Sequence, residues 1–86
     1  MVKEYVRKSG NVKAIQYNNE MRINDCLPEG VFISPTSRGD MPVIRTEMGE
    51  RIINDGDYII IKKNGERVPC RKDLFEMIYD EIKEEI

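Results

Sequence analysis

Apolar and polar residues alternate over short stretches of this chain, a pattern typical of half-buried β-strands. Turn-forming residues such as glycine, proline and asparagine separate the stretches. The pattern predicts strands at residues 2–8, 12–17, 31–33, 43–47 and 50–53. Residues 34–40, Ser-Pro-Thr-Ser-Arg-Gly-Asp, carry the densest turn signals and are expected to form a loop.

A short helix is expected after the second strand. Asn18 or Asn19 can cap it, because an asparagine side chain accepts a hydrogen bond from a free backbone N–H of the first turn. The helix should run to about Cys26, where Leu27-Pro28-Glu29-Gly30 stops it.

The last third of the chain predicts a β-hairpin. Asp57 to Lys63 and Glu66 to Cys70 are both β-rich, and Asn64-Gly65 lies between them. Asn-Gly between two such runs is typical of a two-residue type I′ turn, so we expect this turn here.

A two-residue turn also fixes which hairpin residues share a face of the sheet. The expected pairs are Lys63 with Glu66, Ile61 with Val68, and Ile59 with Cys70, the last two pairs lying on the core face. The outer face would carry Tyr58, Ile60, Lys62, Arg67 and Pro69.

A C-terminal amphipathic helix should follow this hairpin. Asp73 can cap it, and Glu76 three residues later completes the arrangement of a capping box. Apolar residues then recur at spacings of three and four, and are expected to pack on the sheet: Phe75, Ile78, Ile82 and Ile86.

These elements predict an α+β fold. We expect a small, hairpin-rich antiparallel β-sheet of about five to six strands, a short helix after the second strand, and the C-terminal amphipathic helix packed on the sheet. With 86 residues the chain can build one core, so residues 1–86 are expected to form a single domain. No stretch approaches the roughly 20 apolar residues that cross a bilayer, and the N-terminus lacks a signal-peptide pattern. A protein that is neither exported nor membrane-bound is therefore expected.

Composition argues against several classes of enzyme. The chain contains no histidine, which excludes Ser-His and Cys-His pairs and histidine-ligated metal sites. Cys26 and Cys70 are too few for a disulfide scaffold or a four-thiolate metal site. Cys70 precedes Arg71-Lys72, and cations can activate a thiol, but its expected inward position favours a structural role. We expect a non-enzymatic protein without metal or cofactor.

Charge is distributed unevenly along the chain. Residues 62–72 carry five cationic side chains and one carboxylate, whereas residues 73–86 carry six carboxylates and one lysine. The formal net charge of −2 argues against duplex nucleic acid as the partner but leaves a compact anion open. The candidate binding residues are Tyr58, Lys62, Arg67, Arg71, Lys72 and Arg38. The alternative is a solvated face that only keeps the protein soluble.

Three segments resemble a known family. They are Gly56-Asp57-Tyr58-Ile59-Ile60, then Gly65-Glu66, and Cys70-Arg71-Lys72-Asp73-Leu74-Phe75 with Tyr79. In this order they are similar to small tailed-phage and prophage proteins that carry Pro-Gly-Asp-Tyr and Cys-Lys-Pro-Asp-Ile-Phe motifs. Asp55 and Lys72 stand where that family has prolines. The resemblance implies a phage-encoded accessory protein and no particular substrate.

Together these observations lead to two main functional hypotheses, and the least favoured third is a small enzyme that uses Cys70 or a pair of carboxylates. The first is an accessory protein in the host cytoplasm that binds a host protein or a small anionic, nucleotide-like signal, and so interferes with a host factor or host defence. The second is a minor virion or assembly protein that self-associates through the acidic helix or a sheet edge. A homo-oligomer is expected in either case.

Overall fold

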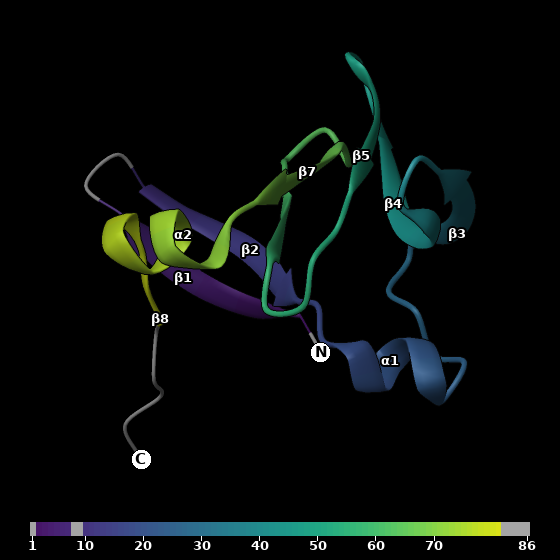
Figure 1. Ribbon diagram of the computed structural model, residues 1–86. Helices are drawn as coiled ribbons and strands as arrows, with labels where there is room; N and C mark the ends of the chain where they lie inside the picture. The colour runs from purple at the N-terminus through teal and green to yellow at the C-terminus, as the bar shows by residue number, and fades with distance from the viewer. Residues whose placement is uncertain (1, 8–9, 82–86) are drawn as a thin grey trace.

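The computed structural model describes residues 2–7 and 10–81 (Figure 1). Within this part, eight strands form two antiparallel sheets. The larger sheet, in the order β7-β6-β2-β1-β8, consists of β1 (Lys3–Arg7), β2 (Gly10–Gln16), β6 (Tyr58–Ile61), β7 (Arg67–Cys70) and β8 (Asp80–Glu81). The smaller sheet consists of β3 (Val31–Thr36), β4 (Gly39–Thr46) and β5 (Gly49–Ile52). The helices are α1 (Asn19–Ile23) and α2 (Lys72–Ile78).

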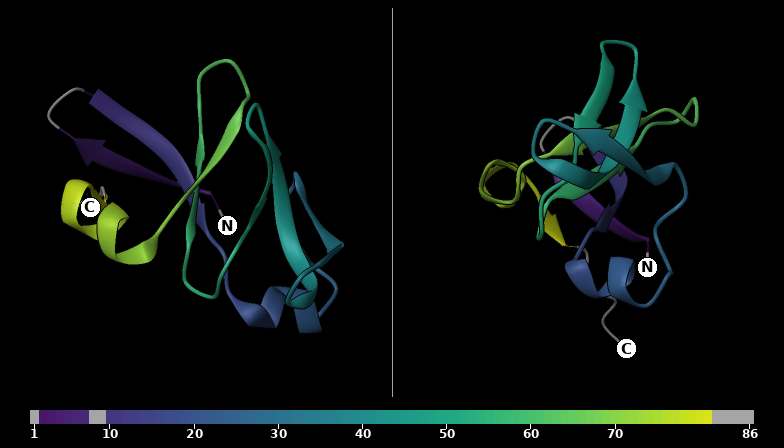
Figure 2. Two further views of the ribbon diagram at one scale, coloured as in Figure 1. Left: turned by 45° about the horizontal axis from the view of Figure 1, so that its top comes forward. Right: turned by 45° about the vertical axis from the view of Figure 1, so that its right-hand side comes forward.

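The larger sheet is covered on both faces. The three-stranded sheet lies against one face and α2 against the other (Figure 2). Neighbouring strand residues point to opposite faces, so Ile15 and Ala14 of β2 belong to different cores. Buried members of the first core are Ile15, Tyr17, Val31, Ile44, Ile53 and Ile59. The second core contains Tyr5, Ala14, Tyr58 and Phe75.

The first two strands and the first helix confirm the pattern in the N-terminal third. β1 and β2 pair as an antiparallel hairpin, and the Asn18 side chain caps α1 by accepting a hydrogen bond from Met21 N at 3.2 Å. The helix ends at Ile23, before the expected Cys26. Asp25 adopts a φ of 54°, a left-handed conformation that no α-helix can continue through.

The expected loop at residues 34–40 is wrong. β3 continues to Thr36 and β4 begins at Gly39, so only Ser37 and Arg38 form the turn. The Thr36 hydroxyl donates to Gly39 O at 2.7 Å and accepts from Arg38 N at 3.1 Å, which closes the turn. Threonine and glycine thus close a tight turn, whereas the proline and serine of this stretch had suggested a longer loop.

The β6–β7 hairpin does not have the expected type I′ turn. That turn requires positive φ at both central residues, but Gly65 has a φ of 87° and Asn64 is not in the positive region. Lys62 N donates to Glu66 O at 2.8 Å, and Gly65 N donates to Lys62 O at 2.9 Å. The loop therefore contains three residues, 63–65, with the glycine in the left-handed position.

The longer loop shifts the register by one residue. Tyr58 pairs with Cys70, and Ile59 pairs with Pro69. Tyr58 faces α2 and is buried instead of lying on a free outer face, whereas Ile59 is buried under the three-stranded sheet. The expected division of the hairpin into a core face and a free face is therefore wrong, because a layer covers each side.

The C-terminal helix is shorter than its apolar pattern predicts. α2 begins at Lys72, with Arg71 at the N-cap position and without a side-chain cap from Asp73. Phe75 is fully buried as expected, but Ile78 is 41% exposed. The chain becomes extended at Tyr79 so that β8 can pair with β1, which ends the helix. Ile82 and Ile86 lie outside the described residues.

The coarse fold class is confirmed as a small, sheet-rich α+β fold with antiparallel strands. The described chain has more strands than the five to six expected, and they form two sheets instead of one. Among the described residues, no helix is long and apolar enough to cross a membrane.

Candidate anion-binding site

Three arginines converge on a hollow between β5 and β7, which we call the arginine hollow. It has a volume of about 410 Å³. Arg38 comes from the β3–β4 turn, Arg51 from β5, and Arg71 from the end of β7. The rest of the lining includes Glu50, Asn54, Asp57, Pro69 and Cys70.

Pairing within the sheets places the arginines here. Arg51 is directly opposite Ile44, a residue of the first core, so both point to the face that meets the larger sheet. Arg38 lies in the turn at the end of β4 that is remote from the β4–β5 turn. Arg71 is positioned where the chain leaves the sheet for α2.

The carboxylates of the arginine hollow already have partners. Glu50 lies 3.6 Å from Arg45 Nη2 and accepts a hydrogen bond from the Ser34 hydroxyl at 3.2 Å. Asp57 accepts a hydrogen bond from Asn54 N at 2.9 Å and is largely buried. These carboxylates are therefore less available to the neighbouring arginines.

The arginines have fewer partners. Arg71 forms a 2.9 Å ion pair with Asp73, but both side chains are more than two-thirds exposed, so the pair is weak. Within the described ranges 2–7 and 10–81, Arg38 and Arg51 form no ion pair, and Arg51 Nη2 contacts Met48 Sδ at 3.9 Å. Their guanidinium donors are available to an anion, which they can bind in a bidentate manner.

Cys70 lies in the same hollow but is not an activated thiol. Burial raises the pKa of Cys70 above its ordinary value, and the negative charges of Asp57 and Asp73 raise it further. The thiol is therefore protonated at neutral pH, which supports a structural role.

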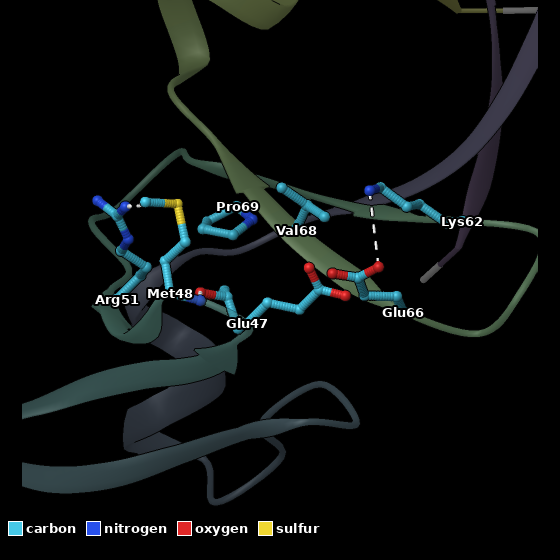
Figure 3. Close-up of a pocket in the computed structure, with 8 residues that line it drawn as sticks. Glu47, Met48, Arg51, Lys62, Glu66, Val68 and Pro69 are labelled. Carbon is cyan, nitrogen blue, oxygen red and sulfur yellow. Dashed lines mark hydrogen bonds and ion pairs between the residues drawn. The ribbon is translucent and has the colours of Figure 1, made fainter.

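A second hollow, the tip cleft, lies beside the β4–β5 turn (Figure 3). Its volume is also about 410 Å³. Arg51 and Pro69 line both hollows, so the two join into one groove between β5 and β7. The tip cleft is lined in addition by Thr46, Glu47, Met48, Lys62, Glu66 and Val68.

Two of the expected binding residues have structural roles instead. Tyr58 is 6% exposed, stacks on Phe75 with ring centroids 4.0 Å apart, and donates its hydroxyl to Glu76 at 2.8 Å. The Arg67 side chain is only 20% exposed and forms a 3.1 Å ion pair with Glu29. Neither side chain lines the arginine hollow.

The two expected lysines lie apart from the arginine hollow. Lys62 borders the tip cleft and forms an ion pair with Glu66 at 3.6 Å. Lys72 places its methylene chain beside Gly56, so close that a Cβ there would lie 3.1 Å from Lys72 Cδ. The structure thus brings together only Arg38 and Arg71 of the six candidates.

Sequence reasoning missed Arg51. Its signal was present in the alternation of β5, because Arg51 and the buried Ile53 are two positions apart and share a face. Only the packing of the two sheets shows that this face opens onto β7 at Arg51.

No protein-family model, curated protein or solved structure matches this chain.

Proposed function

We propose that this protein is a non-enzymatic binding protein that holds an anionic group, a carboxylate or a phosphate, in the arginine hollow. The observation that carries the proposal is the convergence of Arg38, Arg51 and Arg71 from three separate elements. Arginines that approach one hollow from different directions can surround an oxyanion with several charge-assisted hydrogen bonds.

Binding is favoured over catalysis by the chemistry that surrounds this site. The chain has no histidine, and the one thiol in the hollow has a raised pKa. An arginine remains protonated at every physiological pH, so it binds charge well but transfers protons poorly.

The resemblance to tailed-phage proteins supports a biological setting. In this proposal the protein is a phage-encoded accessory protein that acts in the host cytoplasm. Its anionic partner would belong to a host factor or a host defence system, or would be a nucleotide-like signal.

Titration with inorganic phosphate and with citrate, followed by amide chemical shifts, tests the anion site. We expect shifts to concentrate at Arg38, Arg51 and Arg71. Arg38→Ala and Arg71→Ala should each weaken binding about tenfold, equivalent to about 1.4 kcal/mol. Lys63→Ala is the matched control, since it removes an exposed cation that does not line the arginine hollow. Equal weakening by all three variants, or no shift at all, would contradict the proposal.

Self-association is a second candidate, supported by one face of α2. Leu74, Met77 and Ile78 recur at spacings of three and four and are 48%, 80% and 41% exposed. This apolar stripe fits the alternative of a self-associating assembly protein. Light scattering at increasing concentration should show an oligomer that Met77→Glu dissociates, and a wild-type monomer at all concentrations would exclude this candidate.

A further inference from the structure

β5 is an edge strand whose backbone groups face the groove. It is the last strand in the order β3-β4-β5 and pairs only with β4. Ile53 N donates to Pro42 O at 2.9 Å, which fixes the alternation of the ladder. The N–H and C=O groups of Glu50 and Ile52 must therefore point away from β4. Both residues line the arginine hollow.

The opposite wall of the groove is blocked against strand pairing. In β7, Lys62 N donates to Glu66 O, which fixes the alternation of this ladder. The backbone groups of Arg67 and Pro69 therefore point away from β6. Proline has no N–H, so Pro69 removes a donor from the open edge without costing the sheet a hydrogen bond.

The other edges of the described sheets are similarly protected. In β3, Pro35 is opposite Asp40, at a position whose backbone groups point to the open edge. Because proline has no N–H, this edge also lacks a donor there. β8 has only two residues in the described part of the chain. β5 is thus the only edge of the described sheets that is both longer than two residues and free of proline.

The groove beside β5 is balanced in charge at one end and has an excess of cations at the other. In the tip cleft, Glu47 and Glu66 are matched by Lys62 and Arg51 (Figure 3). In the arginine hollow, Arg38 and Arg71 join Arg51, and three guanidinium groups face two carboxylates that already have partners. An extended chain that follows β5 would meet balanced charges near the β4–β5 turn and an excess of guanidinium groups at the far end. Charge complementarity therefore selects a segment whose acidic residues lie at the arginine end.

We propose that β5 accepts an extended acidic segment of a partner protein as an added strand. The backbone of the segment would pair with Glu50 and Ile52, and its carboxylates would bind Arg38, Arg51 and Arg71. This inference rests on the proposed function and identifies its anion as a side-chain carboxylate of a protein. It also explains why the edge of β5 carries no proline.

A pair of synthetic peptides tests the backbone contribution. The probe is a seven-residue peptide of alternating glutamate and valine with blocked termini. Its control carries an N-methyl group on every backbone amide, which keeps the charge but removes the N–H donors from both edges and so prevents strand pairing. The unmodified peptide should slow hydrogen exchange at Glu50 and Ile52 by at least about tenfold, and the N-methylated peptide should bind about tenfold more weakly or worse. Equal affinity of the two peptides would overturn the proposal.

A protein variant provides an independent test. Ile52→Pro removes an outward N–H while leaving the ladder to β4 unchanged, as Pro69 does in β7. Its control is Ile52→Val, which keeps the N–H and most of the side chain. Peptide binding should be lost only in the proline variant, after circular dichroism has shown that both variants fold. The peptide pair still decides the question if the proline variant does not fold.

Inorganic phosphate separates this inference from the anion site itself. Phosphate binding that is as tight as peptide binding, with no protection of Glu50 and Ile52, would overturn strand addition but leave the proposed function intact. Absence of binding by phosphate and by both peptides would overturn both. The expected result is peptide binding that both Arg71→Ala and N-methylation of the peptide weaken about tenfold or more.

Discussion

At the scale of single residues, the role of a side chain depends on which layer covers it. Tyr58 is flanked by charged and apolar neighbours in the sequence, a setting that suggests a ligand contact. In the structure it lies under α2, in an aromatic cluster with Tyr5 and Phe75. Its hydroxyl reaches Glu76 on the outer side of that cluster. Tyr58 is therefore a core residue whose hydroxyl is hydrogen-bonded to α2.

Substitutions at Tyr58 should change stability and not binding. Tyr58→Phe keeps the ring but loses the bond to Glu76, so the free energy of unfolding should fall by about 1 kcal/mol. Tyr58→Ala leaves a cavity beside Phe75 and should cost about 3–5 kcal/mol. Urea unfolding measures both changes. A Tyr58→Phe variant that unfolds like wild type but no longer binds phosphate would restore the ligand role.

The two cysteines should differ in reactivity. Cys26 is exposed, whereas burial raises the pKa of the half-buried Cys70. Because alkylation needs the thiolate, iodoacetamide at pH 8 should modify Cys26 first. The folded protein holds the Cys70 proton more tightly than the unfolded chain does. The protonated Cys70 thiol therefore makes its full contribution to stability at neutral pH. This contribution is lost as the pH rises through the raised pKa of Cys70 in the folded protein. Mass spectrometry measures the rate of modification at each cysteine, and faster modification of Cys70 than of Cys26 would contradict this assignment.

At the scale of elements, local signals located most strands and the first helix cap but could not determine register. Asn18 caps α1 because an N-cap bond involves only neighbouring residues. Asn64-Gly65 is compatible with a two-residue turn and with a three-residue loop, and the choice depends on packing against two layers. A shift of one residue is enough to exchange the faces of β7. The predicted length of the C-terminal helix was wrong for a similar reason, because the pairing of β8 with β1 ends α2.

Alanine substitutions can distinguish a three-residue loop from a type I′ turn between β6 and β7. Gly65 has a φ of 87° and open space around it, so Gly65→Ala should lower the free energy of unfolding by about 1–2 kcal/mol through backbone strain alone. Asn64→Ala loses only the hydrogen bond that Glu66 N donates to the asparagine side chain, so it should cost about 0.5–1 kcal/mol. A type I′ turn would instead strain alanine at both positions, and thermal unfolding of the two variants decides between the turns.

At the scale of the whole molecule, the arginine hollow could not be predicted because it forms between two sheets. Alternation along a strand tells which residues share a face, but not which other strand that face meets. Arg38 and Arg71 were candidates for separate local reasons, and only the packing of β5 against β7 adds Arg51 to them. Tyr58 and Arg67 were lost from the site for the same reason, since other elements of the fold cover or bind them.

The segment before β3 is tied to the larger sheet by Arg67. This side chain extends from β7 and pairs with Glu29, and its methylene chain lies over Gly30. A Cβ at Gly30 would lie 3.0 Å from Arg67 Cδ, at a backbone φ of 87°. Gly49 is a matched control, because it has a φ of 100° but open space where a Cβ would be. Gly49→Ala should therefore show the backbone cost alone, about 1–2 kcal/mol.

A double-mutant cycle can isolate the steric part of this contact. Gly30→Ala should lower the free energy of unfolding by more than Gly49→Ala does, because it adds a clash with Arg67 to the same backbone cost. In an Arg67→Ala background the clash partner is gone, so the two alanine substitutions should become nearly equal. Urea unfolding of the single and double variants measures the coupling. If Gly30→Ala stayed the more costly substitution without Arg67, the contact between this segment and β7 would not be what makes glycine necessary there.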